Sequence, residues 1–418
     1  MYRKSVLPNG VRVVSERIPH TRTVSVGIWV EVGARDEHDL NNGTAHFVEH
    51  MFFKGTPGRS ARQIAIELDA LGGLANAFTT QESTCYYASV LDRNLPQLIG
   101  LYADLLLNSR YAQIEVERER QVILQEFCMV EDTPDDQIQD LFAAQLWGRH
   151  PLGNTVLGSR EVVQAMDSHK LGDYVRRLYV PGRILVAAAG SVEHDSFCRL
   201  WEEALAGLAP GGAELARVAP VPQPPVRKVH SRDLEQVHLV LGTYALPCHA
   251  PERYQLILLN TILGGNMSSR LFQEIRENRG LAYSVGSDLA FYEDSGSLAV
   301  SLGTDREAVN QVIGVIHEEL RRITREPVMA EELANAKEYT TSSLYLAADN
   351  MEARMTRLAR NEICFGREIP LAEAAAGLEQ VTAAEIARLA EKLFAARDLA
   401  LTALGPLGHD DIDWSLFR

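Results

Sequence analysis

The feature that most constrains the fold is a segment rich in proline and glycine that divides the chain into two halves. Both residues cluster between Ala206 and Lys228. This composition is typical of a linker, because neither residue favours the interior of a helix or a strand. A chain of 418 residues is also longer than one domain usually is. We therefore predict an N-terminal domain over 1–210, a linker over 211–226 and a C-terminal domain over 227–418.

The two halves share a short motif, which indicates an internal duplication. Residues 71–76 (LGGLAN) are similar to residues 278–283 (NRGLAY), and strand-like alternation follows both segments. Strands grouped with amphipathic helices favour the α+β class. Helices are predicted at 61–71, 95–107, 114–129, 134–147, 193–206, 251–263, 306–324 and 329–361. Strands are predicted on both sides of the turn Asn9-Gly10 and at 184–190.

Charge and composition exclude several classes of function. The formal net charge of −15 repels phosphate backbones, so we expect no nucleic-acid partner. No apolar run approaches the roughly 18 residues that a membrane span needs. Because a hairpin is predicted at the start of the sequence, we expect no signal or transit peptide. Five scattered cysteines without a C-x-x-C pair fit a reducing cytoplasm.

One pentapeptide, His46-Phe47-Val48-Glu49-His50, carries the chemistry. On a helix, two histidines four residues apart share one face and can bind one metal ion. Glu49 lies about 100° around the helix from His50, near enough to take a proton from a water without being a ligand. The pentapeptide is the inverted form of the H-E-x-x-H zinc peptidase motif.

A catalytic zinc ion takes three protein ligands, so a third must come from another segment. Glu119 and Glu126 lie seven residues apart on the helix predicted at 114–129. Seven residues are two turns, so both carboxylates face the same way. On spacing alone, either could be the third ligand.

These motifs together resemble the inverted-zincin metallopeptidases, the family of insulin-degrading enzyme, pitrilysin and the β-subunit of mitochondrial processing peptidase. The flanking residues 43–45 (GTA) and 51–56 (MFFKGT) are also similar to that family. The resemblance covers nearly the whole chain and is closest to short, two-domain bacterial members. It implies two homologous α/β-roll domains and one zinc ion per chain. It also implies that Glu126 is the third ligand and that Glu119 supports the site.

The same resemblance implies residues that contact substrate. The second half has no H-x-x-E-H motif, but it carries Arg276 and Tyr283. In the family this pair approaches the zinc from the opposite domain and steadies the oxyanion. Without the resemblance, the pair would be a surface arginine and a core tyrosine. Asn76 and Ala77 would lie on an edge strand that pairs with an extended substrate.

Two acidic residues offer a source of selectivity. Asp136 and Asp140 match positions that receive an arginine near the cleavage point in the processing-peptidase branch. Thr133, Pro134 and Asp135 precede them, and such a run is equally typical of a helix N-terminus. Both interpretations stay open for Asp136, whereas Asp140 is better placed for the substrate role.

Taken together, these residues predict a zinc-dependent endopeptidase that hydrolyses peptides or unfolded, presequence-like segments, with a preference for basic residues near the cleavage site. Glu49 takes the proton of the attacking water and returns it to the leaving amine, while Tyr283 and Arg276 stabilise the tetrahedral intermediate. One chain carries both half-sites, so we expect a homodimer that encloses a chamber. The alternatives are a non-catalytic subunit or a catalytic half that needs a different partner chain.

Overall fold

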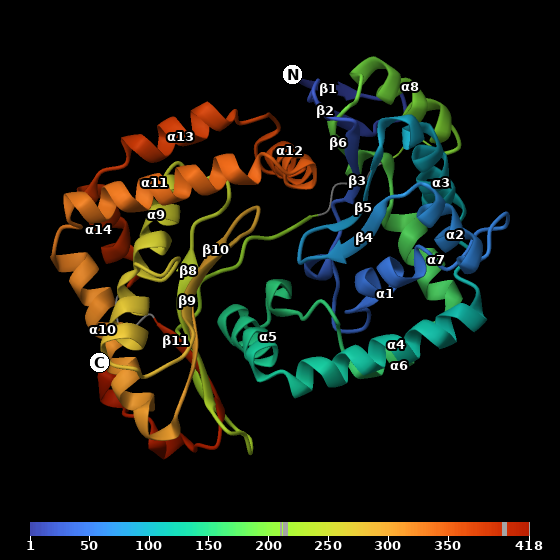
Figure 1. Ribbon diagram of the computed structural model, residues 1–418. Helices are drawn as coiled ribbons and strands as arrows, with labels where there is room; N and C mark the ends of the chain where they lie inside the picture. Colours follow the sequence, from blue (N-terminus) through green and yellow to red (C-terminus); the bar gives the residue numbers. More distant parts are fainter. Residues whose placement is uncertain (210, 212–215, 395–398, 418) are drawn as a thin grey trace. The chain divides into compact units, whose positions relative to one another are not determined.

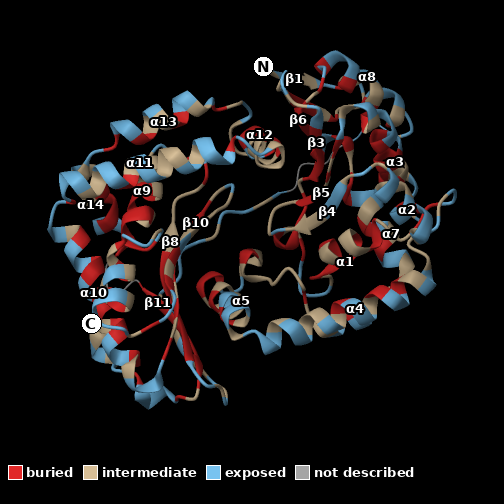
Figure 2. Cartoon of the chain, viewed as in Figure 1, coloured by how far each residue is buried: buried red, intermediate tan, exposed pale blue. Residues whose placement is uncertain are grey.

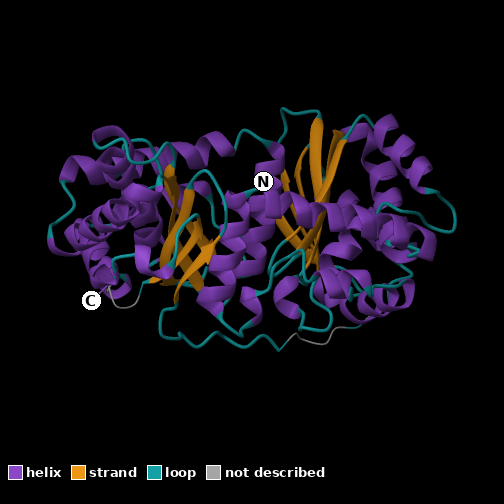
Figure 3. Cartoon of the chain, turned by 90° about the horizontal axis from the view of Figure 1, so that it is seen from below, coloured by secondary structure: helices purple, strands orange, loops and turns teal. Residues whose placement is uncertain are grey.

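The computed structural model describes residues 1–209, 211, 216–394 and 399–417, which form two compact units (Figure 1). Unit 1 consists of Met1–Met129, Asn154–Arg217 and Leu346–Glu368, and unit 2 consists of Val130–Gly153, Val218–Tyr345 and Ile369–Arg418. In each unit, helices cover both faces of a sheet (Figure 3). Residues 210 and 212–215 of the predicted boundary and linker lie outside the described residues. Residues 216–226 contain neither helix nor strand.

The sheet of unit 1 is antiparallel apart from one parallel pair of strands, β2 and β6. Its strand order is β1-β2-β6-β3-β5-β4, which leaves β4 at one edge. The strands are β1 (Tyr2–Val6), β2 (Arg12–Arg17), β3 (Thr23–Val30), β4 (Leu74–Thr79), β5 (Thr84–Leu91) and β6 (Ile184–Gly190). The predicted Asn9-Gly10 turn joins β1 to β2, with Gly10 at a φ of 102°. An L side chain rarely adopts that angle, so glycine suits this position.

The sheet of unit 2 repeats this topology. Its strands are β7 (Arg227–Ser231), β8 (Val237–Ala245), β9 (Val285–Phe291), β10 (Gly296–Thr304) and β11 (Ala400–Gly405). The order β7-β11-β8-β10-β9 matches β2-β6-β3-β5-β4, including a parallel first pair. The remaining pairs are antiparallel in both sheets. The predicted fold of two similar domains, each with a mostly antiparallel sheet and packed helices, is confirmed.

Most helices lie where the periodicity predicts them. Those encoded before the linker are α1 (Thr44–Met51), α2 (Ala61–Ala70), α3 (Leu95–Asn108), α4 (Gln113–Asp132), α5 (Pro134–Trp147), α6 (Arg160–Gln164), α7 (Ser168–Leu178) and α8 (His194–Ala204). Those encoded after it are α9 (Arg253–Leu263), α10 (Val309–Arg325), α11 (Ala330–Ala347), α12 (Met351–Phe365), α13 (Leu371–Gln380) and α14 (Ala383–Leu393).

The prediction of a single helix over 329–361 is wrong, because the helical conformation is interrupted between α11 and α12. Asn350 is extended there, and its side-chain oxygen accepts a hydrogen bond from the N–H of Ala353. Asn350 is therefore the N-cap of a new helix. Its side-chain oxygen accepts from a backbone N–H of the first turn, which has no partner within the helix.

One face of each sheet packs against helices of its own half, and the opposite face packs against a helix from the other half (Figure 2). In unit 1, Met355 and Leu358 of α12 pack on Trp29 and Leu185. In unit 2, the exchanged helix is α5, which contributes the cluster Ile138, Phe142, Leu146 and Trp147. The compact units therefore differ from the contiguous stretches 1–210 and 227–418, because α5 and α12 each join the unit encoded by the other half.

Candidate metal centre

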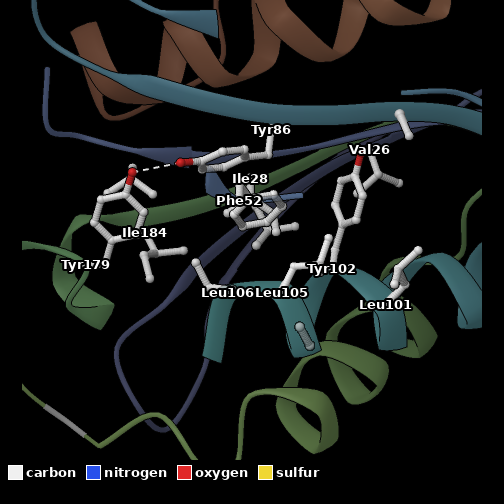
Figure 4. Packing of buried hydrophobic residues seen from close by; sticks show 14 of the residues in the cluster. Val26, Ile28, Phe52, Tyr86, Leu101, Tyr102, Leu105, Leu106, Tyr179 and Ile184 are labelled. Carbon is white, nitrogen blue, oxygen red and sulfur yellow. Dashed lines mark hydrogen bonds between the residues drawn. The ribbon is translucent and has the colours of Figure 1, made fainter. Parts of the chain in front are cut away.

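The pentapeptide lies on α1, a helix with one buried and one open face. Phe47, Val48 and Met51 are at most 1% exposed and hold the helix against the core of unit 1. The ring of Phe52, directly after α1, stacks on Tyr86 with centroids 3.7 Å apart (Figure 4). These anchors leave the face that carries His46, Glu49 and His50 only half-buried.

The start of α1 is held by Glu37, a residue to which no sequence motif points. Its carboxylate is buried and accepts hydrogen bonds from the backbone N–H groups of Gly43 (2.7 Å) and Ala45 (2.6 Å). The side-chain amide of Asn42 donates a third, at 3.1 Å. Burial raises the pKa of Glu37 to about 7, against the effect of these donors. A carboxylate at this point satisfies the free N–H groups of a helix N-terminus and complements its dipole.

The third candidate ligand comes from α4, which packs alongside through one face. Val116, Glu119 and Ile123 are its buried residues. Glu126 follows on the same side, seven residues after Glu119, and its side chain is 32% exposed. The helical spacing thus brings both carboxylates to the histidines, as predicted.

His46, His50 and Glu126 each offer one atom to a common point, and these atoms lie within 4.8 Å of one another. Nε2 of His46 is 3.5 Å from Oε2 of Glu126, and Nε2 of His50 is 3.4 Å from Oε1. Two ligands about 2.1 Å from one zinc ion, at tetrahedral angles, lie about 3.4 Å apart. Two imidazoles and one carboxylate are also a donor set that catalytic zinc uses, so these residues fit the ion.

Glu119 lies behind the candidate ligands and contacts one of them. Its Oε2 is 3.3 Å from Nδ1 of His50, on the ring edge opposite Glu126. Its Oε1 accepts a hydrogen bond from Nζ of Lys54 at 2.6 Å. Lys54 lies in the segment 51–56 after the pentapeptide, where no sequence pattern indicates this contact. Nδ1 of His46 is buried without a hydrogen-bond partner among the described residues, so packing orients that ring.

The two glutamates of the site favour a positive charge beside them. Desolvation lowers the pKa of His50, but hydrogen bonds to Glu119 and Glu126 outweigh it and raise the pKa to about 9. Desolvation and the neighbouring His50 lower the pKa of His46 to about 4, which keeps it neutral, as a metal ligand must be. Desolvation raises the pKa of both glutamates, yet the histidines, together with Lys54 at Glu119, lower them overall. Both carboxylates are therefore ionised.

The predicted base, Glu49, is held by a residue of the edge strand. Oγ1 of Thr79 donates a hydrogen bond of 2.6 Å to Oε2 of Glu49. Burial raises the pKa of Glu49, although Thr79 opposes the shift. A carboxylate with a raised pKa suits proton transfer near neutral pH.

Asn76 and Ala77 lie on β4, the edge strand of unit 1, as predicted. The backbone N–H of Ala77 bonds the side-chain oxygen of Asn76 at 2.9 Å instead of a neighbouring strand. This N–H therefore points to the free edge of the sheet, where an added strand would pair.

The remaining predicted residues belong to unit 2. Arg276 lies on a π-helical segment, Phe272–Asn278, with its guanidinium 4.8 Å from the ring centroid of Tyr283 and 4.9 Å from that of Phe272. Tyr283 is 82% exposed, so it is not a core tyrosine. Asp136 is exposed and Asp140 is half-buried, both on α5. Among the helices in the described parts of the chain, none has the length and apolar composition to cross a bilayer.

Comparisons with known proteins show the family of the chain. Residues 12–160 match the family model for insulinase, peptidase family M16, and residues 166–339 match the M16 inactive domain. A protein of Mycobacterium bovis named a zinc protease is 42% identical over 416 residues, covering 97% of this chain and 93% of its own. A zinc protease of Bacillus subtilis is 38% identical over 410 residues, covering 98% and 99%.

A protease from Helicobacter pylori has the same fold, with a TM-score of 0.89, 19% identity, and coverage of 97% of this chain and 99% of that one. The two relatives, which match this chain over nearly their whole length, are named zinc proteases. The second matched model is called inactive, which agrees with a second half that has no zinc motif. The chain therefore belongs to peptidase family M16, the insulinase family, as a short two-domain member of the bacterial type.

Proposed function

We propose that this chain is a zinc-dependent endopeptidase with one catalytic zinc ion per chain. The observation that carries the proposal is the group formed by His46, His50 and Glu126, in which Glu126 lies from each histidine at the separation expected for two ligands of one tetrahedral ion. A scaffold protein would have no need for that group or for a carboxylate held beside it. Glu49 lies on the same helix face, fixed by Thr79.

The roles of the residues follow from their contacts. When bound, the zinc ion activates a water molecule and polarises the scissile carbonyl. Glu49 accepts a proton through the oxygen that Thr79 leaves free, and later gives it to the leaving amine. Glu119 accepts from Nδ1 of His50, which directs Nε2 of that ring to the metal.

Substrate binds in an extended conformation along β4 in this proposal. Support comes from the outward N–H of Ala77, which Asn76 would release to a substrate carbonyl. We assign Arg276 and Tyr283 to stabilisation of the oxyanion, since both are donors and the tyrosine is exposed. Asp140, and with it Asp136, would receive a basic side chain near the cleavage point. The substrates are peptides or unfolded, presequence-like segments enclosed in a chamber.

Digestion of a peptide library tests the activity. The zinc-loaded chain should cleave peptides, as read by mass spectrometry, and a chelator should abolish cleavage. Glu49→Gln should lose at least about 10²-fold in kcat while keeping zinc. His46→Gln and Glu126→Gln should lose zinc itself, measured by mass spectrometry of bound metal. Glu67→Gln, which removes a carboxylate from α2, is the matched control and should change neither. Unchanged cleavage by Glu49→Gln would refute this mechanism.

We also propose that the chain forms a homodimer and acts in the cytoplasm. One sequence carries both the zinc motif and the Arg276–Tyr283 pair, so two copies can supply two complete sites. The five cysteines are scattered and include no C-x-x-C pair, which fits a reducing compartment. Light scattering of the active protein should give twice the chain mass of 46.3 kDa. Activity that appears only after a different chain is added would instead support the heteromeric alternative.

A further inference from the structure

The strand proposed to bind substrate also carries the residue that holds the base. We propose that Thr79 is a positioning residue that fixes the orientation of Glu49 and links it to substrate bound along β4. The proposal rests on the proposed function, because it takes Glu49 as the base.

The hydroxyl proton of Thr79 has one clear acceptor. Its Oγ1 lies 2.6 Å from Oε2 of Glu49 and 3.5 Å from Oγ1 of Thr84. Thr84 donates its own proton to the carbonyl of Val32 at 3.0 Å. An ionised carboxylate can only accept, so the short contact uses the proton of Thr79. One oxygen of Glu49 is thereby occupied, and the other remains for proton transfer.

Strand parity shows where the backbone of Thr79 points. The N–H of Thr80 donates to the carbonyl of Ser83 at 2.8 Å, so the backbone of Thr80 points towards the β5 side of β4. The N–H of Ala77 points outward to its Asn76 partner. Alternate residues of an antiparallel strand pair on opposite sides. The N–H and C=O groups of Ala77 and Thr79 therefore both face the free edge of β4.

Side-chain alternation places the hydroxyl on the catalytic side of the same strand. Phe78 packs in the cluster beneath α12, on one face of the sheet. Its neighbours Ala77 and Thr79 face the other side, towards α1. A peptide that pairs with the edge of β4 would thus bond the backbone of Thr79 while its side chain holds Glu49. Ordering of this residue by substrate would order the base.

Three variants test the inference in the zinc-loaded full chain. Thr79→Val keeps the shape but removes the hydroxyl, and Thr79→Ser restores a hydroxyl. Thr80→Val removes the neighbouring hydroxyl, which bonds Ser83 and not Glu49. We expect Thr79→Val to lower kcat about 10–100-fold, with KM and bound zinc within about two-fold of the wild type. Thr79→Ser should recover most of kcat, and Thr80→Val should leave it unchanged.

A crystal structure of each zinc-loaded variant adds a readout that does not depend on activity. Glu49 should keep one orientation in the wild type and in Thr79→Ser, and lose it in Thr79→Val. The inference fails if Thr79→Val keeps kcat, if zinc is lost in parallel with activity, or if serine does not rescue. If the wild-type chain cleaves no peptide, the proposed function fails by itself, and the orientation of Glu49 in the two variants still decides the role of Thr79.

Discussion

Asp140 illustrates how the surroundings of a single residue change its chemistry. Burial on α5, together with the charge of Asp136, raises its pKa to about 6. In the unfolded chain the same proton leaves near the usual pKa of about 3.9. The folded state therefore holds more protons between these values, so the contribution of Asp140 to stability is full below about pH 4 and is lost as pH rises through 6.

Replacement of the Asp140 carboxylate should remove this loss of stability at neutral pH. We expect Asp140→Asn to raise the free energy of unfolding at pH 7.5 by about 1–2 kcal/mol, with no gain near pH 4. Urea denaturation at several pH values measures this, and the exposed Asp132→Asn is the control. If Asp140 also binds a basic side chain, the variant loses cleavage of arginine-containing peptides more than of arginine-free ones. An equal change for both peptide classes would exclude that role.

Tyr283 is the residue whose exposure most favours a role outside the core. Because its ring is 82% exposed, removal of the hydroxyl should leave the melting temperature unchanged. If the hydroxyl steadies the oxyanion, Tyr283→Phe should lower kcat about 10²-fold or more. Tyr345→Phe, a half-exposed tyrosine of α11, is the control. Normal kcat in Tyr283→Phe would remove the hydroxyl from the mechanism.

Among the elements, α12 shows how closely a helix from the second half fits the first sheet. Met355 is fully buried against β3, where Gly27 leaves room for its side chain. A Cβ at Gly27 would lie 2.6 Å from Sδ of Met355 and 2.3 Å from the ring of Trp29. Glycine is required here by the ring of Trp29 and the approach of α12, and not by backbone angle.

We expect Gly27→Ala to destabilise the protein by about 1–3 kcal/mol, because the rigid indole ring and α12 must move apart. Gly100→Ala is a matched control within α3, where a Cβ meets no atom within 4 Å. That change should instead stabilise by about 0.5–1 kcal/mol through helix propensity. Chemical denaturation compares the two, and equal effects would show that α12 packs more loosely than described.

For the whole molecule, the exchange of α5 and α12 makes each unit depend on both halves of the chain. Each exchanged helix buries several large apolar side chains, and each of these contributes about 1.5–3 kcal/mol when removed from water. Polar contacts add to this in unit 1, where Glu362 of α12 pairs with Lys4 at 2.7 Å. Either half alone would expose one apolar sheet face.

Cleavage of the connection should therefore leave the halves associated. A specific protease site inserted after Gln223, in a segment without helix or strand, allows the folded full chain to be cut. We expect the two fragments to co-elute in size-exclusion chromatography and to separate only in denaturant. Dissociation in buffer alone would show that the exchanged helices contribute little.

Local patterns in the sequence were enough to predict most of the helices and the candidate metal ligands, apart from the choice between two carboxylates. The pentapeptide on α1 predicted two candidate ligands, and the seven-residue spacing on α4 narrowed the third to Glu119 or Glu126, because a helix converts spacing directly into direction. Choosing Glu126 over Glu119 already needed the family resemblance, and the structure agrees through the distances to His46 and His50.

Tertiary structure alone decided the rest. Lys54 and Thr79 reach the site through contacts with groups distant in sequence, and Glu37 reaches α1 across the intervening loop. No helical or strand period encodes such contacts. The break before α12 and the exchange of two helices likewise depend on which apolar face meets which sheet. An amphipathic sequence indicates that one face of a helix must be buried. Which sheet buries that face is determined only when the whole chain packs.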